Sequence, residues 1–456
     1  MSILSIFPAR KLVAAKPGGV NEVFWLALPV VIQTLAETAM NVIGTALVGR
    51  LGTASLGAIG FAGIWVWTLL VPLAGVATGV QVFVSRDDGA KLPKQCGPWV
   101  WHALWLTVPA MLVWASLLAL LLPHLFGVVG ADPELRALAV AYGLARLPGG
   151  PAIVVEFALS SFFRGIGDTR TPLMAACVGV LVNIFCSVAL IFGRWGAPQL
   201  GIAGAGFAQS IGSYTIAAIL LWAFLRNRVR EQYATAPIPP DRPAIRRFSR
   251  TSAAIGGQWL LDMASFTIFT SIVARMGAAA MAASQAMLQL LSISFMQAVA
   301  LATAASTLVG RYLGSRDLEA ASRSFRSAQV LAIALAACVA ALFMAIPEQL
   351  IGLFASDPAV SALAGPLLAL GAFFQLLDAI GIVAGGSLRG AGDTRWPFFV
   401  QATLAWLLRL PVVYFFAVVL GRGVFGAWSG ELVYIGVLGG VFVLRFRSGQ
   451  WQHTQI

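Results

Sequence analysis

Charge is scarce in this chain of 456 residues: 11% of the residues are charged, whereas 59% are hydrophobic. A soluble protein carries charge on roughly 25% of its residues. Apolar runs of about 20 residues, the length that crosses the hydrocarbon core of a bilayer, recur along the whole sequence. The scarcity of charge therefore excludes a soluble domain and predicts an integral membrane protein that crosses the bilayer many times.

Cysteine and histidine are also rare, and their spacing excludes two kinds of site. The four cysteines, Cys96, Cys177, Cys186 and Cys338, have no CxxC spacing, so they predict neither a disulfide framework nor a zinc site. The three histidines form no HExxH motif, and no nucleophile has a recognisable base partner. We therefore expect no enzymatic activity, no cofactor and no metal centre, with Na⁺ as the one metal ion to consider.

Lysine and arginine outnumber aspartate and glutamate by 30 to 18, and their positions explain the excess. With the N-terminus in the cytoplasm, 23 of the 30 basic residues fall in cytoplasmic segments and five in outer loops. This asymmetry follows the positive-inside rule and predicts that both termini lie on the cytoplasmic side of the plasma (inner) membrane. Because the excess is topological, it predicts no nucleic-acid partner. The twelve predicted spans are residues 23–48, 56–84, 98–122, 137–163, 173–193, 202–225, 250–274, 281–310, 327–346, 361–388, 397–418 and 424–444.

A polar heptapeptide occurs twice in this hydrophobic sequence. "RGIGDTR" at 164–170 returns as "RGAGDTR" at 389–395, an offset of 225 residues. A shared offset over the whole chain is the signature of a tandem duplication, here of a six-span unit. The same offset relates further pairs: Arg86 and Arg311, Asp132 and Asp357, Gly52 and Gly277, and Gly201 and Gly426.

The duplication predicts the fold. Six spans are an even number, so both halves enter the membrane with the same orientation and are related by an axis along the membrane normal. We predict an all-α integral membrane fold with twelve transmembrane helices in two six-helix lobes, and a substrate site between the lobes near the midplane. The N-terminal lobe is predicted at 1–225 and the C-terminal lobe at 251–456. The basic, proline-rich stretch 226–250 is predicted to be a cytoplasmic linker.

Each heptapeptide is predicted to join the fourth and fifth spans of its lobe on the cytoplasmic side. Arg164 has Asp168 close by in sequence, and Arg389 has Asp393, so each copy holds a potential ion pair. One interpretation is a latch that gates the cytoplasmic side. The interpretation we favour is a turn that starts the next helix, because ion pairs in loops usually serve local structure.

Five of the eighteen acidic residues fall inside predicted spans: Glu37, Glu156, Asp262, Asp378 and Glu431. A charged side chain at the bilayer centre costs about 2.5–3.5 kcal/mol on insertion scales, so such residues are retained for pairing or function. Glu37 and Asp262 are related by the 225-residue offset, whereas Asp378 has Ile153 as its counterpart.

We predict Asp378, Asp262 and Glu37 as the residues that couple transport to a cation or proton. For Glu37 and Asp262, the alternative is a structural tie to Arg146, Arg409 or a polar neighbour, and for Glu37 the two interpretations are equal. Glu156 and Glu431 are expected to be solvated or locally paired. Polar residues predicted to contact substrate or ion are Asn41, Asn183, Gln258, Gln285, Gln375 and Glu156. Apolar and aromatic candidates for a cavity wall are Trp65, Trp67, Phe266, Phe269, Met287, Phe295 and Phe373.

Several segments, taken in order, resemble the MATE (multidrug and toxic compound extrusion) family of the MOP superfamily. They are "TALVGRLGTASLGA" at 45–58, "RGIGDTRTP" at 164–172, "GIAGAG" at 201–206 and "GSLRGAGDTR" at 386–395. The resemblance covers residues 20–445. It implies a V-shaped twelve-helix exporter that moves organic cations outward in exchange for inward protons or sodium ions. Asp262 and Asp378 match acids on the seventh and tenth spans of the NorM-type branch, which implies coupling through the C-terminal lobe.

The chain departs from the family in its N-terminal lobe. Many members carry an aspartate where this sequence has Gly44, and another four residues after Asn183, where it has Ser187. The sodium site that the resemblance implies in this lobe has lost both acids, with Glu37 as a hypothetical substitute. H⁺ is therefore the expected coupling ion and Na⁺ the alternative. The expected partners are lipophilic organic cations and membrane lipid, with the protein as a monomer.

A second hypothesis is a flippase of a lipid-linked or amphiphilic precursor, since the same superfamily includes flippases. A flippase for pyrophosphate-bearing lipids would call for a cationic cavity. The arginines in or near the membrane that could form one are Arg146, Arg409 and Arg275. We rank this hypothesis below export of organic cations.

Overall fold

The computed structural model describes residues 16–128, 133–352 and 358–454. Its first half forms six long helical segments, two of them broken by a short turn. Asp132 and Asp357, one of the predicted repeat pairs, lie outside the described residues. The segments of the first half are α1 (Val20–Gly49), α2 (Thr53–Thr78) continued by α3 (Val80–Gly89), α4 (Pro93–Val128), α5 (Pro133–Arg146) continued by α6 (Gly150–Gly165), α7 (Arg170–Phe192) and α8 (Ile202–Leu225).

The second half repeats this arrangement. Within the described residues, the twelve predicted spans all correspond to helical segments, and eleven of these are long and apolar enough to cross a membrane. The remaining one is α10, whose apolar part is interrupted by Gln258, Asp262 and several hydroxyl side chains. The segments are α10 (Arg242–Ala274), α11 (Ala278–Gly314), α12 (Leu318–Ala345), α14 (Pro358–Gly390), α15 (Arg395–Leu404) continued by α16 (Leu410–Tyr414), and α17 (Gly423–Arg447), with the short helices α9 (Asn227–Tyr233) and α13 (Pro347–Gly352).

The predicted linker is partly helical, which corrects the sequence-based boundary. α10 begins at Arg242, so residues 242–250 are its first turns and not a loop. Pro243 lies in the first turn, where its fixed φ favours helix entry and its missing N–H costs nothing. The linker proper is reduced to α9 and the short stretch that follows it.

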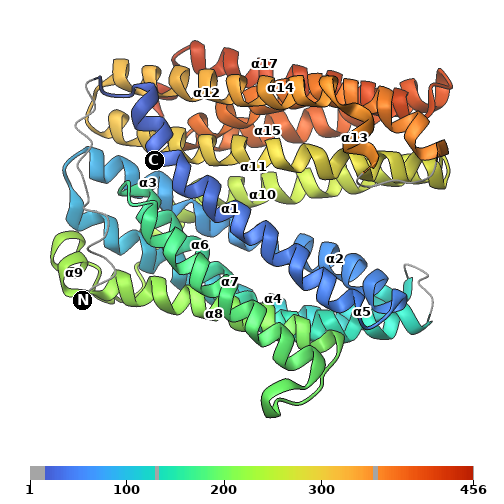
Figure 1. Cartoon of the computed structure of the whole chain (residues 1–456). Coiled ribbons are helices and arrows are strands. Elements are labelled where there is room, and N and C mark those ends of the chain that lie inside the picture. Colours follow the sequence, from blue (N-terminus) through green and yellow to red (C-terminus); the bar gives the residue numbers. More distant parts are fainter. Residues whose placement is uncertain (1–15, 129–132, 353–357, 455–456) are drawn as a thin grey trace.

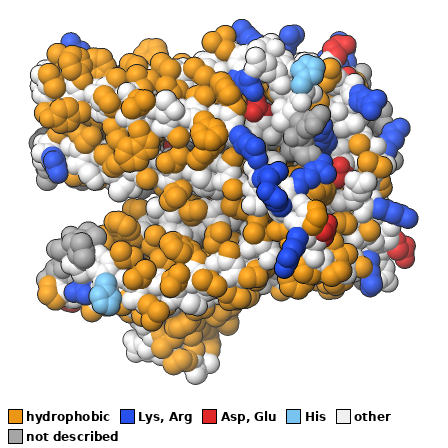
Figure 2. Space-filling view, turned by 180° about the vertical axis from the view of Figure 1, so that it is seen from behind, with side chains coloured by type: hydrophobic (Ala, Val, Ile, Leu, Met, Phe, Trp, Pro, Cys, Tyr) orange, Lys and Arg blue, Asp and Glu red, His pale blue; other side chains and the backbone are white. Residues whose placement is uncertain are grey.

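The two halves form two lobes arranged as a V (Figure 1). The lobes meet at the end that carries α3 and α9, called the closed end below, and diverge toward the end that carries α5 and α13. The space-filling view shows the cleft between the lobes at the open end and a broad hydrophobic surface on the visible face of both lobes (Figure 2). The predicted two-lobe helical fold is confirmed.

Glycine contacts at the closed end follow the pseudo-two-fold axis. A Cβ atom added to Gly89 would lie 1.9 Å from the carbonyl oxygen of Arg311. A Cβ atom added to Gly314, the repeat counterpart of Gly89, would lie 2.0 Å from the carbonyl oxygen of Arg86. Since Arg86 and Arg311 are also counterparts, each lobe places the same glycine against the same residue of the other. Only glycine permits this approach of α3 and α11.

Polar contacts also hold the two lobes together at the closed end. The Gln81 amide donates to the carbonyl oxygen of Thr303 at 3.0 Å and to the Thr307 hydroxyl at 2.9 Å. The Thr307 hydroxyl in turn donates to the carbonyl oxygen of Arg164, which belongs to the first heptapeptide, at 3.1 Å. An ion pair between Arg311 and Asp88 at 3.3 Å crosses the same boundary. The first heptapeptide therefore lies within the contact that holds the lobes together.

Helix α1 contacts both lobes, although the predicted boundary at residue 225 assigns it to the N-terminal lobe. Its first turns place Val23 and Ala27 in an apolar cluster with residues of α11, α12 and α14. Its Glu22 carboxylate accepts a hydrogen bond from the Tyr312 hydroxyl on α11 at 2.7 Å. The rest of α1 packs against α7 of the N-terminal lobe.

Candidate functional site

Arg409 is the centre of a charged cluster inside the C-terminal lobe. It ends a π-helical turn, Ala405–Arg409, inserted between α15 and α16, and only 2% of its surface is exposed. Such turns rotate the helix locally and are frequent at functional sites. The Arg409 guanidinium makes two parallel bonds to the Glu431 carboxylate, Nη2 to Oε1 at 2.6 Å and Nε to Oε2 at 2.8 Å. This bidentate geometry is the strongest form of the pair.

The remaining guanidinium surface is also occupied. Its Nη1 donates to the Ser265 hydroxyl at 2.5 Å. Its Cζ lies 5.0 Å from the ring centre of Tyr434, and 5.9 and 6.0 Å from those of Phe266 and Phe269. These ring faces favour a cation in a site with little water. Arg409 is therefore held in one position by a carboxylate, a hydroxyl and three aromatic rings.

Asp262 and Asp378 lie beside this pair, and Asp262 forms a long ion pair with Arg409, which is the structural tie that was the alternative for this residue. Asp262 Oδ1 is 4.0 Å from Arg409 Nη1, and 48% of the aspartate side chain is exposed. The Gln401 side chain lies near the Asp262 carboxylate and favours its charged form. Asp378 interacts electrostatically with Asp262, Glu431 and Arg409 but forms no ion pair or hydrogen bond with a described residue. Three carboxyl groups thus share one arginine, which leaves two negative charges in excess.

Acids and arginines are equal in number in the corresponding group of the N-terminal lobe. The Gln33 amide donates to Glu37 at 3.0 Å, and the Gln33 oxygen accepts from Arg164 Nη2 at 3.0 Å. Glu156 interacts electrostatically with Glu37, Arg164 and Arg146. Two carboxyl groups therefore face two arginines, and the charges of this group cancel. The structural tie that the sequence offered for Glu37 is present, through Gln33 to Arg164.

This asymmetry has arisen at positions where the two repeats differ. Arg146 and Glu156 lack charged counterparts in the C-terminal lobe, whereas Arg164 is matched by Arg389; Asp378, Arg409 and Glu431 lack charged counterparts in the N-terminal lobe. The counterpart pairs are Arg146 and Gly371, Glu156 and Gly381, Ile153 and Asp378, Ile184 and Arg409, and Gly206 and Glu431. Glu37 and Asp262 are the acids that the lobes share.

The structure separates the other predicted polar contacts into buried and exposed residues. Asn183 is buried, and its Nδ2 has no hydrogen-bond partner among the described residues. Gln375 is buried and donates to the carbonyl oxygen of Ala336 at 3.3 Å. Gln258 is buried one turn before Asp262, but among the described residues no hydrogen bond joins the two side chains, and Gln258 Oε1 has no partner. Asn41 and Gln285 are exposed.

The local ion pairs predicted for the heptapeptides are wrong. Asp168 Oδ1 accepts from the backbone N–H groups of Arg170 and Thr171 at 3.1 Å each, and Oδ2 accepts from the Thr171 hydroxyl at 2.6 Å. Its oxygens are thus used to cap the start of α7, while Arg164 reaches Gln33. Asp393 likewise pairs with Arg445 at 2.9 Å and not with Arg389. The geometry agrees with a helix-starting turn.

Other outcomes concern Glu431 and the aromatic candidates. Glu431 is buried in its pair with Arg409, so the expectation of a solvated or locally paired acid is met by pairing and not by solvation. Phe269 and Met287 lie in the core of the C-terminal lobe and do not line a cavity. Trp67, Phe295 and Phe373 have exposed side chains.

Sequence reasoning missed Ser265, Gln401 and Tyr434. A helical spacing signal was present for two of them: Ser265 follows Asp262 by three residues, and Tyr434 follows Glu431 by three, which places each pair on one helix face. Gln401 precedes Arg409 by eight residues, and the intervening π-helical turn changes that relation in a way that spacing does not reveal.

Comparisons with known proteins agree with the architecture. The MatE family model matches residues 29–189 and 254–415. The two matched stretches begin 225 residues apart, which is the offset of the repeat. The chain is 27% identical over 442 residues to the probable multidrug resistance protein NorM of Thermotoga maritima, covering 96% of this chain and 94% of that one. It is 28% identical over 440 residues to the multidrug resistance protein MdtK of Yersinia pseudotuberculosis, covering 94% and 95%.

Solved structures show the same fold. A MOP superfamily transporter from Pyrococcus furiosus superposes with a TM-score of 0.87 at 20% identity, covering 95% of this chain and 97% of that chain. An outward-facing multidrug resistance MATE family transporter gives the same TM-score, identity and coverage. Because the family model matches most of the chain in both repeats, the chain belongs to the MATE family as a NorM-like transporter.

Proposed function

We propose that this transporter exports lipophilic organic cations in exchange for inward protons, by alternating access. The observation that carries the proposal is the charge of the C-terminal cluster, in which Asp262, Asp378 and Glu431 share a single arginine of the described residues, Arg409. Two uncompensated negative charges inside a membrane are stabilised by a bound cation or by protons. The names of the NorM and MdtK relatives, which are multidrug resistance proteins, agree with this chemistry.

The residues of the cluster have separate roles in this proposal. Glu431 neutralises Arg409 and fixes it, so this pair forms the scaffold. Asp262 is half exposed and Asp378 has no partner of its own, so these two exchange a cation for protons. Protonation from the outside weakens the hold on the exported cation and releases it. Loss of the proton to the cytoplasm restores the charge for the next cation.

The orientation follows from the basic residues. Lys and Arg side chains gather at the closed end (Figure 2), which also carries the linker helix α9. We place this end in the cytoplasm by the positive-inside rule, with both termini there and the cleft open to the outside of the plasma (inner) membrane. Inward opening then requires that the contacts of Gly89 and Gly314, and the Arg311–Asp88 pair, separate.

Protons are the proposed coupling ion, with Na⁺ as the alternative. The N-terminal acids face two arginines and have no charge left over for a sodium ion, and the two further acids of the family are absent at Gly44 and Ser187. A proton exchanged for one monovalent cation is electroneutral, so one pH unit supplies about 1.4 kcal/mol, a tenfold concentration ratio. The negative C-terminal cluster also speaks against the flippase hypothesis, which needs a cationic cavity.

Efflux from proteoliposomes tests the proposal. Vesicles loaded with a fluorescent lipophilic cation receive either a proton gradient or a sodium gradient, with Asp378→Asn beside the parent protein. Glu319→Gln is the matched control, because Glu319 is an exposed carboxylate at the start of α12. Proton-driven efflux that disappears in Asp378→Asn and persists in Glu319→Gln is the expected result. Sodium-driven efflux indifferent to Asp378 would refute C-terminal coupling, and no efflux under either gradient would refute cation export.

A further inference from the structure

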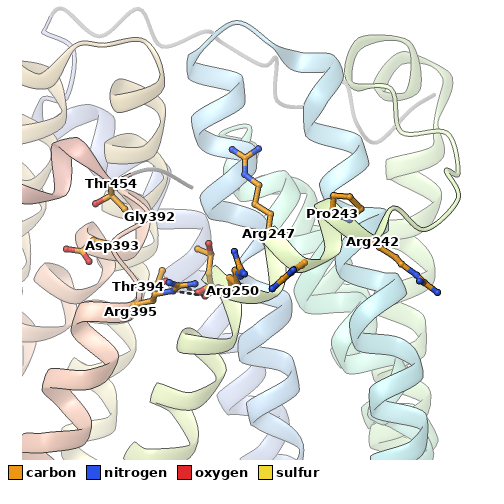
Figure 3. Close-up of a pocket in the computed structure, with 11 residues that line it drawn as sticks. Arg242, Pro243, Arg247, Arg250, Gly392, Asp393, Thr394, Arg395 and Thr454 are labelled. Carbon is orange, nitrogen blue, oxygen red and sulfur yellow. Dashed lines mark hydrogen bonds between the residues drawn. The ribbon is translucent and has the colours of Figure 1, made fainter.

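A cavity of about 800 Å³ lies at the closed end, outside the membrane cluster described above (Figure 3). It is formed by the first turns of α10, the second heptapeptide and Thr454 near the end of the chain. This volume falls in the range of small-molecule sites. Five of its eleven lining residues are arginines: Arg242, Arg246, Arg247, Arg250 and Arg395.

The charge of the cavity is one-sided. Its single acidic lining residue is Asp393, and the Asp393 carboxylate is already bound to Arg445 at 2.9 Å. Arg242, Arg246 and Arg250 follow one another at intervals of four residues and so share one face of α10. Like charges at this spacing repel and destabilise a helix. An anion in the cavity removes that cost.

Contacts between the two walls keep the arginines together. The Thr394 hydroxyl donates to the carbonyl oxygen of Thr251 at 2.7 Å. The Nε of Arg395 donates to the carbonyl oxygen of Arg250 at 3.2 Å, which turns its side chain toward α10 (Figure 3). The second heptapeptide is thereby fixed to α10, and arginines from two separate spans face one space.

The cluster is specific to the C-terminal repeat. In the N-terminal repeat, the positions equivalent to the four arginines of α10 hold Pro17, Asn21, Glu22 and Trp25. The positive-inside rule requires only an excess of basic residues in the cytoplasmic loops. It does not require that they gather around one cavity. Arg247 already lies 5.6 Å from the ring centre of Trp99 and interacts with Asp87. The other three arginines, which line one cavity and occur in one repeat only, therefore point to a ligand.

The depth of the cluster indicates the source of the anion. The predicted membrane span begins at residue 250, and Arg242 lies eight residues, or about 12 Å along the helix axis, beyond it. The headgroup layer on each side of a bilayer is about 5–8 Å thick. The arginines thus pass through the headgroup layer, where basic pockets between transmembrane helices bind anionic lipid headgroups.

We infer that this cavity is a binding site for the phosphate group of an anionic phospholipid from the cytoplasmic leaflet. Arginine suits this ligand because its planar guanidinium matches phosphate oxygens with two parallel hydrogen bonds. The bound headgroup bridges α10 and the loop that precedes α15. Since α10 carries Asp262 and the span of α15 leads to Arg409, the lipid stabilises the framework of the coupling cluster from outside it.

The site is tested by lipid retention and thermal stability. The purified full-length protein in a neutral detergent is titrated with cardiolipin, phosphatidylglycerol or phosphatidylcholine, and bound lipid is counted by native mass spectrometry. The pocket variant is Arg242→Gln/Arg246→Gln/Arg250→Gln. The matched control is Arg226→Gln/Arg228→Gln/Arg230→Gln, which removes the same charge from exposed positions at the start of α9. Inorganic phosphate is titrated separately to identify a soluble anion.

The expected result is retained anionic lipid and a raised Tm in the parent and in the α9 variant, with both lost in the pocket variant. Phosphatidylcholine is expected to give neither effect. Equal losses in the two triple variants would refute the cavity as the site, because they would reflect overall charge. A rise in Tm with inorganic phosphate equal to that with lipid would refute the lipid as the source. Should the triple variant fold poorly, Arg246→Gln/Arg250→Gln is the milder variant, expected to lower lipid retention by at least half.

Discussion

Neutralising one partner of the buried Arg409–Glu431 pair is expected to destabilise the protein strongly. The two side chains are 2% and 3% exposed, and their two hydrogen bonds measure 2.6 and 2.8 Å. Removal of one partner of such a pair leaves an uncompensated buried charge and costs about 3–5 kcal/mol. We therefore expect Glu431→Gln and Arg409→Met each to lower the free energy of unfolding by about this amount.

The double variant Arg409→Met/Glu431→Gln separates pairing from the presence of charge. It removes both charges together, so neither is left alone in the lobe, and replacement of a whole buried pair is often neutral or stabilising. We expect its stability to approach that of the parent protein, less the contacts that Arg409 makes with Ser265 and the surrounding rings. Unfolding by a denaturing detergent, followed by circular dichroism for the four proteins of the cycle, measures the coupling energy.

Transport by the same variants tests the charge argument. The parent cluster carries two excess negative charges from Asp262 and Asp378, and the double variant preserves that excess. Glu431→Gln alone reduces the excess to one, and Arg409→Met alone raises it to three. Proton-driven efflux should therefore survive in the double variant better than in either single one. Losses of stability that simply add in the double variant, or efflux abolished in it as completely as in the singles, would contradict this reasoning.

Two further predictions concern the closed end and the heptapeptide. Gly89→Val should prevent the approach to Arg311 and shift spin-label distances across the closed end toward the separated state, whereas Gly440→Ala, whose Cβ would meet nothing within 4 Å, should leave them unchanged. Asp168→Ala should lower stability by about 0.5–2 kcal/mol through the lost cap of α7 without changing which ion drives efflux. A larger effect of Asp168→Ala on coupling than on the unfolding midpoint would restore the gate interpretation.

The large-scale organisation of this chain could be predicted because two signals act over long distances in sequence. Hydropathy gave the twelve spans, and the 225-residue offset gave the two lobes and the pairing of Glu37 with Asp262. The sequence also showed that Asp378 is an acid present in one repeat only, because its counterpart is Ile153. These inferences depend on which residues are present, and the cost of charge in lipid makes that information reliable.

The pairing of charges could not be predicted in the same way, because it depends on how helices rotate against one another. Arg409 reaches Glu431 on α17 from the end of a π-helical turn, and no local pattern in the sequence marks that turn. Asp168 lies four residues from Arg164, yet the free N–H groups at the start of α7 claim its oxygens. Backbone geometry decides whether the Asp168 carboxylate binds the arginine nearby in sequence or the N–H groups at the start of the helix.

The path from the cluster to the lobe boundary lies along α10. Its Gly256 would place a Cβ atom 2.4 Å from the carbonyl oxygen of Pro72 on α2, so the two lobes touch there without room for a side chain. Gly256 precedes Asp262 by six residues, about 9 Å along the helix. A change in charge at Asp262 that moves α10 by a fraction of a turn must therefore alter its fit against α2. Transmission needs a contact with two distinct arrangements, and we expect the glycine crossing of α10 and α2 to be that contact. The acid that we propose to exchange the cation and the contact that we propose to open between the lobes are thus parts of one helix.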